Sequence, residues 1–218
     1  MSIRISVRAE PHSLGEPIEV AVAISNDDDR VLALDDPRTS QSITAHLLDS
    51  RTNEDMSYTM GKLDVTTFGE DQYALVIPKS EVVEIAPRAA FDFTTDANER
   101  LFLRPGTFQV FVTDDGDGGE VKSNELRLRI EITRESIPHL LALAQDMERD
   151  YGRREWAMDW LAKLYPAFRL ELPPPDAQAA SRERMEARNR AIYADFTAWW
   201  QENEHTPAVD ALLQRLNS

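Results

Sequence analysis

The sequence contains no cysteine among its 218 residues. This absence excludes disulfide frameworks, thiolate metal sites and cysteine nucleophiles. No run of about 18 apolar residues occurs, so we expect no transmembrane helix. Residues 1–8 alternate apolar and polar positions and lack the continuous apolar stretch of a signal peptide. From the sequence we therefore expect a soluble, cytoplasmic protein.

The motifs of common enzyme and cofactor sites are also missing. The four histidines are His12, His46, His139 and His205, and none is spaced four residues from another as in helical zinc sites. No nucleophile elbow, phosphate loop or dinucleotide fingerprint is present. Carboxylates are too abundant for any pair to be singled out. We expect a non-enzymatic protein with no catalytic residue, no metal and no cofactor.

Negative charge dominates the chain. It has 24 lysines and arginines against 39 aspartates and glutamates, a net charge of −15. Residues 134–218 hold 11 basic and 14 acidic residues, so residues 1–133 hold the other 13 basic and 25 acidic ones, a net charge of −12. Such a surface repels nucleic acids and anionic lipids and attracts basic proteins, although acidity also serves solubility alone. The expected partner is another, basic protein, with no nucleic acid and no membrane, and the oligomeric state is left open.

Residues 1–133 show the period of two that is typical of β-strands. Val20, Val22 and Ile24 alternate with small or polar residues, which predicts a strand with one buried face. Further strands are expected at 31–34, 42–48, 56–60, 63–68, 72–77, 81–86, 89–94, 107–113 and 120–132. Short strands separated by proline and glycine turn signals favour a sandwich or a barrel.

Three stretches of this region resemble bacterial immunoglobulin-like sandwich domains. They are Leu14-Gly-Glu-Pro-Ile18 before a strand that ends in Asn26, then Pro105-Gly-Thr-Phe-Gln-Val110, and finally Ser123-Asn-Glu-Leu126. The resemblance covers residues 1–133 and implies an antiparallel β-sandwich. Domains of that kind generally mediate adhesion, inhibition or contact between domains. None of the three stretches supplies a catalytic residue.

After residue 133 the apolar period changes to about 3.6 residues, which indicates helices. Ser136 is expected to cap the first helix and Gly152 to end it. A second helix is expected over about 153–165, and Asp176 is expected to cap a third. Thr206, followed by a proline, is expected to cap the last helix. The predicted fold class is segregated α+β: an immunoglobulin-like antiparallel β-sandwich over 1–133 and a helical domain of about four helices over 134–218.

Two acidic loops are candidate partner-binding sites, and we expect them at one pole of the sandwich because such loops fall at the same end of that fold. Their candidate residues are Asp27, Asp28, Asp29, Asp114, Asp115 and Asp117. Asp35 and Asp36 would join them if the preceding strand is short. A linear calcium loop starting at Asp114 fails, because Gly116 and Gly118 occupy ligand positions. Three interpretations stay open: solvated loops, a grip on a basic partner, or a composite Ca²⁺ site.

Trp199 and Trp200 are the remaining candidate partner-binding residues. Adjacent residues on a helix point about 100° apart, so we expect one ring in the core. The other is expected to pack against the sandwich or to contact a partner, since tryptophan is enriched at binding hot spots.

These observations favour a non-catalytic protein-binding module whose acidic sandwich surface engages a partner protein. An immunity or inhibitor protein against a toxin or hydrolase is a sharper form of this hypothesis. One alternative is an enzyme with a carboxylate-based site at the domain junction, for which Arg153, Arg154, Glu155 and Asp159 are candidates. Another is a structural subunit that forms homo-oligomers through an edge strand or the third helix.

Overall fold

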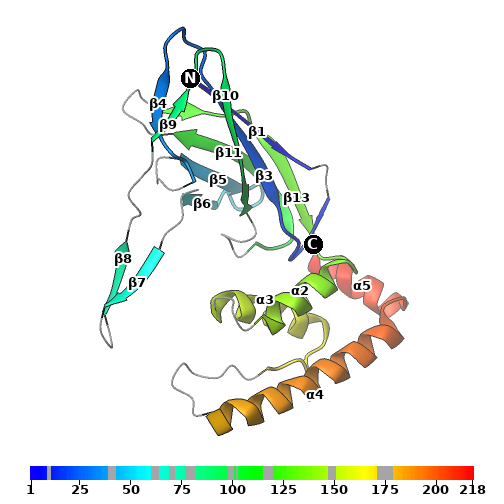
Figure 1. Cartoon of the computed structure of the whole chain (residues 1–218). Helices are drawn as coiled ribbons and strands as arrows, with labels where there is room; N and C mark the ends of the chain where they lie inside the picture. The colour runs from blue at the N-terminus through cyan, green and yellow to red at the C-terminus, as the bar shows by residue number, and fades with distance from the viewer. Residues whose placement is uncertain are drawn as a thin grey trace. The chain divides into compact units, whose positions relative to one another are not determined.

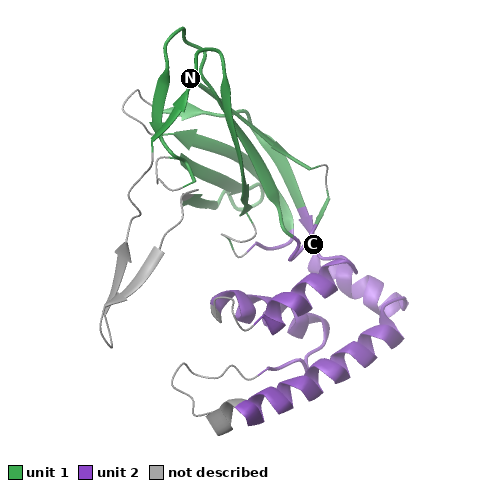
Figure 2. Cartoon of the chain, in the orientation of Figure 1, with its two compact units in different colours: residues 1–12, 17–101, 106–129 green, residues 13–16, 102–105, 130–218 purple. Residues whose placement is uncertain are grey.

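The computed structural model describes residues 1–8, 11–38, 43–59, 64–68, 72–76, 82–97, 101, 103–114, 120–146, 151–170 and 179–218. The chain divides into two compact units, coloured separately in Figure 2. The first comprises residues 1–12, 17–101 and 106–129, and the second comprises residues 13–16, 102–105 and 130–218. The division into two domains at 1–133 and 134–218, expected from the sequence, stays a prediction.

Strands make up the N-terminal region and helices the C-terminal part (Figure 1). This arrangement confirms the predicted segregated α+β class, while the immunoglobulin-like form of the strand region stays a prediction. The strands are β1 (Ser2–Val7), β2 (His12–Ser13), β3 (Glu19–Ser25), β4 (Leu32–Asp35), β5 (Ile43–Asp49), β6 (Asp55–Thr59), β7 (Asp64–Phe68), β8 (Gln72–Val76), β9 (Val82–Ile85), β10 (Ala90–Asp96), β11 (Gly106–Asp114), β12 (Val121–Lys122) and β13 (Leu126–Glu131). The helices are α2 (Ser136–Gln145), α3 (Tyr151–Leu164), α4 (Ala179–Asn203) and α5 (Pro207–Leu216).

Two larger sheets organise the strands. One is three-stranded with the order β1-β3-β10, and the other is six-stranded with the order β2-β13-β11-β5-β6, where β12 pairs with β11. β4 pairs with β9, and β7 with β8. The registers place Ile5 and Phe93 on either side of Val22 in the first sheet, and Val110 opposite Leu47 in the second.

Alternate residues of both sheets are buried, as the period of two predicts. Ile5 and Val22 are 2% and 1% exposed, and Leu47 and Val110 are fully buried. The apolar core of the strand region comprises Ile3, Ile5, Ile18, Val20, Val22, Ile24, Ile43, Ala45, Leu47, Ile85, Phe93, Phe108, Val110, Val112 and Leu128. Each large apolar side chain buried in this way stabilises the fold by about 1.5–3 kcal/mol.

The strand expected over 120–132 is broken between β12 and β13. The amide group of Asn124 replaces a strand partner: its Oδ1 accepts from the Ile5 N–H at 2.8 Å, and its Nδ2 donates to the Ile5 carbonyl at 3.1 Å. Next to it, the Ser123 hydroxyl accepts from the Val112 N–H at 2.9 Å. These side chains tie β1 of one sheet to β11 of the other, so the break is a connection between the sheets.

The observed helix boundaries agree only in part with those predicted from the sequence. Thr206 caps α5 as predicted, and its Oγ1 accepts from the Val209 N–H at 3.4 Å. Ser136 is instead the first residue of α2, and its hydroxyl accepts from the Thr133 N–H at 2.9 Å. The prediction that Gly152 ends a helix is wrong: α2 ends at Gln145, and Gly152 lies in the first turn of α3.

Two short segments from the N-terminal half pack with the helices. Gly15 has a φ of +89°, and a Cβ there would lie 3.3 Å from side-chain atoms of both His139 and Leu140 of α2. The Trp156 indole N–H donates to the Leu103 carbonyl at 3.0 Å. Contacts of this kind explain why the second compact unit, called the helical unit below, includes residues 13–16 and 102–105.

The long helix α4 is mostly polar on its surface. Among the described residues, no helix is both long enough and apolar enough to cross a membrane. The cap predicted for this helix at Asp176 lies outside the described residues.

Candidate functional site

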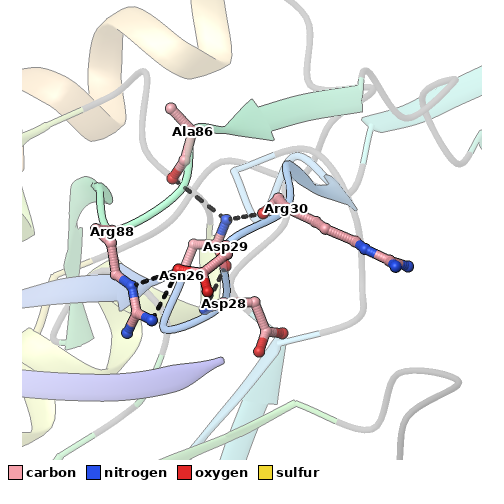
Figure 3. Close-up of polar contacts among 6 residues, drawn as sticks. All are labelled: Asn26, Asp28, Asp29, Arg30, Ala86 and Arg88. Atoms are coloured by element: carbon pink, nitrogen blue, oxygen red, sulfur yellow. Dashed lines mark hydrogen bonds and ion pairs between the residues drawn. The ribbon is translucent and has the colours of Figure 1, made fainter.

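The acidic turn that follows β3 is held in place by a buried asparagine (Figure 3). Asn26 is 2% exposed. Its Nδ2 donates to the carbonyls of Arg30 at 2.7 Å, Ile85 at 2.9 Å and Ala86 at 3.2 Å. Its Oδ1 accepts from the Asp28 N–H at 3.1 Å. One side chain therefore connects the turn to the last residue of β9 and to the residue that follows it.

The segment after β9 is fixed to the same asparagine by its backbone. The Asn26 N–H donates to the Ala89 carbonyl at 2.9 Å, and the Arg88 N–H donates to the Asn26 carbonyl at 3.1 Å. Arg88 adopts a left-handed conformation with a φ of 60°. Its guanidinium donates to Asp29 Oδ1 from Nη2 at 2.8 Å and from Nε at 3.2 Å.

The carboxylates of this turn project into solvent. Asp29 is 86% exposed and its partner Arg88 is 66% exposed, so their ion pair contributes only about 0–1 kcal/mol. Asp27 lies 3.6 Å from the N-terminal ammonium of Met1. Asp28 is exposed and pairs with no cation in the part of the chain that the structure describes. All three carboxylates are thus accessible to a cation from another molecule, which can pair with them directly or take the place of their present partner.

The second acidic loop is described only at its start. Asp114 is the last residue of β11, is half-buried and pairs in register with Val121. Asp115 and Asp117 lie outside the described residues, so the meeting of the two loops stays a prediction. Within the described ranges, no group of three or more Asp, Glu and His residues could hold a metal ion.

Asp36, which the sequence placed with the acidic loops only on the condition of a short preceding strand, is not part of the exposed acidic surface. Its side chain is 3% exposed and accepts from the Arg38 guanidinium, with Nε at 2.9 and 3.0 Å and Nη2 at 2.5 Å. The hydrogen bonds from Arg38 hold the pKa of Asp36 below its ordinary value. The guanidinium also lies 5.2 Å from the centre of the Phe91 ring. The Asp36 carboxylate is therefore buried against Arg38, whose side chain is 58% exposed, whereas Asp35 is exposed.

Both tryptophans of α4 join one aromatic cluster of the helical unit. Its centre is Phe196, which is fully buried. Trp199 stacks on Tyr165 with ring centres 5.0 Å apart, and the ring of Trp200 is parallel to that of Phe196 at 6.5 Å. Both are half-buried, so the two rings share the packing against this cluster. Their contact with a partner stays a prediction.

The four candidates of the enzymatic alternative lie on α3. Arg153 and Arg154 are each 6% exposed, whereas Glu155 and Asp159 are exposed. The two arginines are thus buried, whereas the two acidic residues are exposed to solvent.

No protein-family model matches this sequence, and no curated protein matches it. Among solved structures, a β-glucosidase from Listeria innocua in complex with gluconolactone is 17% identical, covers 59% of this chain and has a TM-score of 0.32. The sporulation control protein Spo0M from Bacillus subtilis is 13% identical, covers 65% of this chain and has a TM-score of 0.27. The present chain spans 16% of the first and 55% of the second. Similarity this low carries no argument about fold or function.

Proposed function

We propose that the strand region is an immunoglobulin-like sandwich that serves as a non-catalytic protein-binding module and engages a basic partner through Asp27, Asp28 and Asp29. The observation that carries the proposal is the buried amide of Asn26, which fixes the backbone of this turn while its carboxylates stay exposed. A turn fixed in advance loses little conformational entropy on binding. The net charge of −12 on residues 1–133 attracts a basic surface over a longer range.

The ion pair between Asp29 and Arg88 is compatible with this role. An exposed pair of this kind stabilises the free protein very little, so a partner's lysine or arginine can replace Arg88 at small cost. Asp114, Asp115 and Asp117 and the tryptophans Trp199 and Trp200 remain candidate contact residues. Immunity or inhibition against a toxin or hydrolase is one form such binding can take.

The experiment is capture from extracts of the native cell with three immobilised forms of the full chain. One is the natural protein, and the second carries D27N, D28N and D29N. The third is a control with the same change in net charge, E155Q, D159N and D195N, at exposed positions of α3 and α4. A protein retained by the natural form and the control, but lost from the turn variant and on raising salt, supports the proposal. Equal retention by all three forms contradicts it.

A further inference from the structure

The helical unit contains a pocket of about 370 Å³. The described residues that line it come from three helices: Gln145 of α2, Arg154 of α3, and Glu186, Asn189, Arg190 and Tyr193 of α4. We propose that this pocket binds a small organic anion whose oxyanion group, a carboxylate or a phosphate ester, is received by Arg154. The site is separate from the acidic turn, and the inference does not depend on the proposed function.

Arg154 carries the argument because it is a buried cation without a counter-ion in the described residues. The residue is 6% exposed. Its Nε donates to the Ala144 carbonyl at 3.3 Å, and no carboxylate of the described ranges pairs with its guanidinium. A neutral carbonyl at the end of α2 offers only a partial negative charge. Burying a guanidinium without an anionic partner carries a large desolvation free energy. An anion bound in the pocket would compensate it by pairing with the guanidinium.

The geometry of the guanidinium suits an oxyanion. Its planar fork of N–H groups matches the two oxygens of a carboxylate or phosphate. The hydrogen bond from Arg154 Nε to the Ala144 carbonyl orients the guanidinium. Its other N–H donors belong to the same side chain, which lines the pocket.

Two of the lining residues on α4, Arg190 and Tyr193, provide further donors. Glu186, Arg190 and Tyr193 follow one another at spacings of four and three residues, which places them on one face of the helix. Burial raises the pKa of Tyr193 to about 12, with Arg154 close enough to oppose part of that rise. The phenol hydroxyl therefore remains a donor at neutral pH. Arg190 adds a second positive charge against the single carboxylate of Glu186.

The sign of the charge in this pocket is opposite to that of the whole protein. Two arginines face one carboxylate among its described lining residues, in a chain whose net charge is −15. The volume lies within the range of about 300–1,000 Å³ that is common for small-molecule sites. A small anion therefore fits both the charge and the size.

The test is isothermal titration calorimetry on the full chain at constant ionic strength. The probes are succinate and glycerol 3-phosphate, each compared with a neutral analogue, succinamide and glycerol. We expect saturable binding of at least one charged probe with a Kd of about 1 mM or tighter and none of its neutral analogue. Binding of succinate alone identifies a carboxylate site, and binding of glycerol 3-phosphate alone a phosphate site. Absence of binding by both, or equal binding of the neutral analogues, overturns the proposal.

Three single variants locate the bound anion. R154M is expected to weaken binding at least about tenfold, because it removes a charge-assisted pair of hydrogen bonds. R190M is expected to weaken it to a smaller extent, whereas R188M, which changes an exposed arginine of α4 outside the pocket lining, leaves it unchanged. Unaltered affinity in R154M overturns the proposal. If R154M does not fold, equal affinities of R190M and R188M overturn it instead.

Discussion

The side-chain amide of Asn26 donates to the carbonyl of Ile85 at 2.9 Å, across 59 residues of sequence. The same amide donates to the carbonyl of Arg30 at 2.7 Å. Because the donor is buried and each acceptor is a backbone group, the end of β3 and the end of β9 are held at one point. These hydrogen bonds fix the backbone conformation of the acidic turn that follows β3.

We expect Asn26→Ala to destabilise the strand region by about 2–4 kcal/mol, because it leaves buried carbonyls without donors. Denaturant unfolding of the natural chain and the variant measures the difference. Asn26→Asp is the sharper comparison, since the shape is kept while a donor becomes an acceptor. If Asn26→Asp is as stable as the natural protein at neutral pH, the donated hydrogen bonds are not what fixes the turn.

The ion pair between Asp36 and Arg38 predicts a pH-dependent contribution to stability. The pKa of Asp36 is lowered in the folded protein, so its contribution is present above the unfolded pKa of about 3.9 and is lost as pH falls through the folded value. We expect Asp36→Asn to cost about 1–3 kcal/mol near neutral pH. The measurement is the free energy of unfolding from about pH 7 down to pH 3.

In that experiment the gap between the natural protein and Asp36→Asn should narrow below about pH 4. Asp92→Asn, at an exposed position of β10, serves as the control and should follow the natural protein throughout. A gap that stays constant with pH would show that Asp36 acts through packing and not through its charge.

Gly15→Ala is expected to destabilise the helical unit by about 1–3 kcal/mol. The φ of +89° disfavours any side chain, and the added Cβ would crowd His139 and Leu140 of α2 at 3.3 Å. Gly106→Ala is the matched comparison, since a Cβ there meets only Phe108 at an ordinary 3.6 Å. Thermal unfolding of both variants should show a clear loss for Gly15→Ala and little change for Gly106→Ala, and equal losses would refute the close approach at Gly15.

Tyr193 predicts a loss of stability in alkaline solution. Its pKa is raised to about 12 in the folded protein, against about 10 in the unfolded chain. As pH rises above about 10, the unfolded state loses the proton first and is favoured. Unfolding free energies between about pH 8 and 11 should therefore fall more steeply for the natural protein than for Tyr193→Phe. Parallel curves would mean that the phenol of Tyr193 is not buried as described.

Alternation alone was enough to predict the central strands. Val20, Val22 and Ile24 are buried and their neighbours are not, because a pleated strand with one covered face permits no other arrangement. The break at Ser123-Asn124 could not be predicted in the same way. It depends on Asn124 meeting the backbone of Ile5, 119 residues away, and a contact at that separation leaves no periodic signal.

The same distinction applies to the candidate sites. The acidic stretch at Asp27–Asp29 is visible in the sequence, but the burial of Asn26 beneath it is not. The charged run Arg153-Arg154-Glu155 is visible in the sequence, but nothing in it marks Arg154 as the residue that lines a pocket. The pocket is completed by side chains from α2 and α4 such as Gln145 and Tyr193, and helical periodicity defines the face of each helix without showing which faces meet.

Binding through the acidic turn is tested by the affinity of the captured partner for three forms of the chain: the natural chain, D27N/D28N/D29N and the charge-matched E155Q/D159N/D195N. The measurement is a titration of purified proteins at low and at physiological salt. We predict at least about tenfold weaker binding by the turn variant and natural affinity in the charge-matched control. The difference in affinity between the natural chain and the turn variant should become smaller as salt is added. Equal affinities of the two triple variants would contradict a binding role for the turn that Asn26 holds.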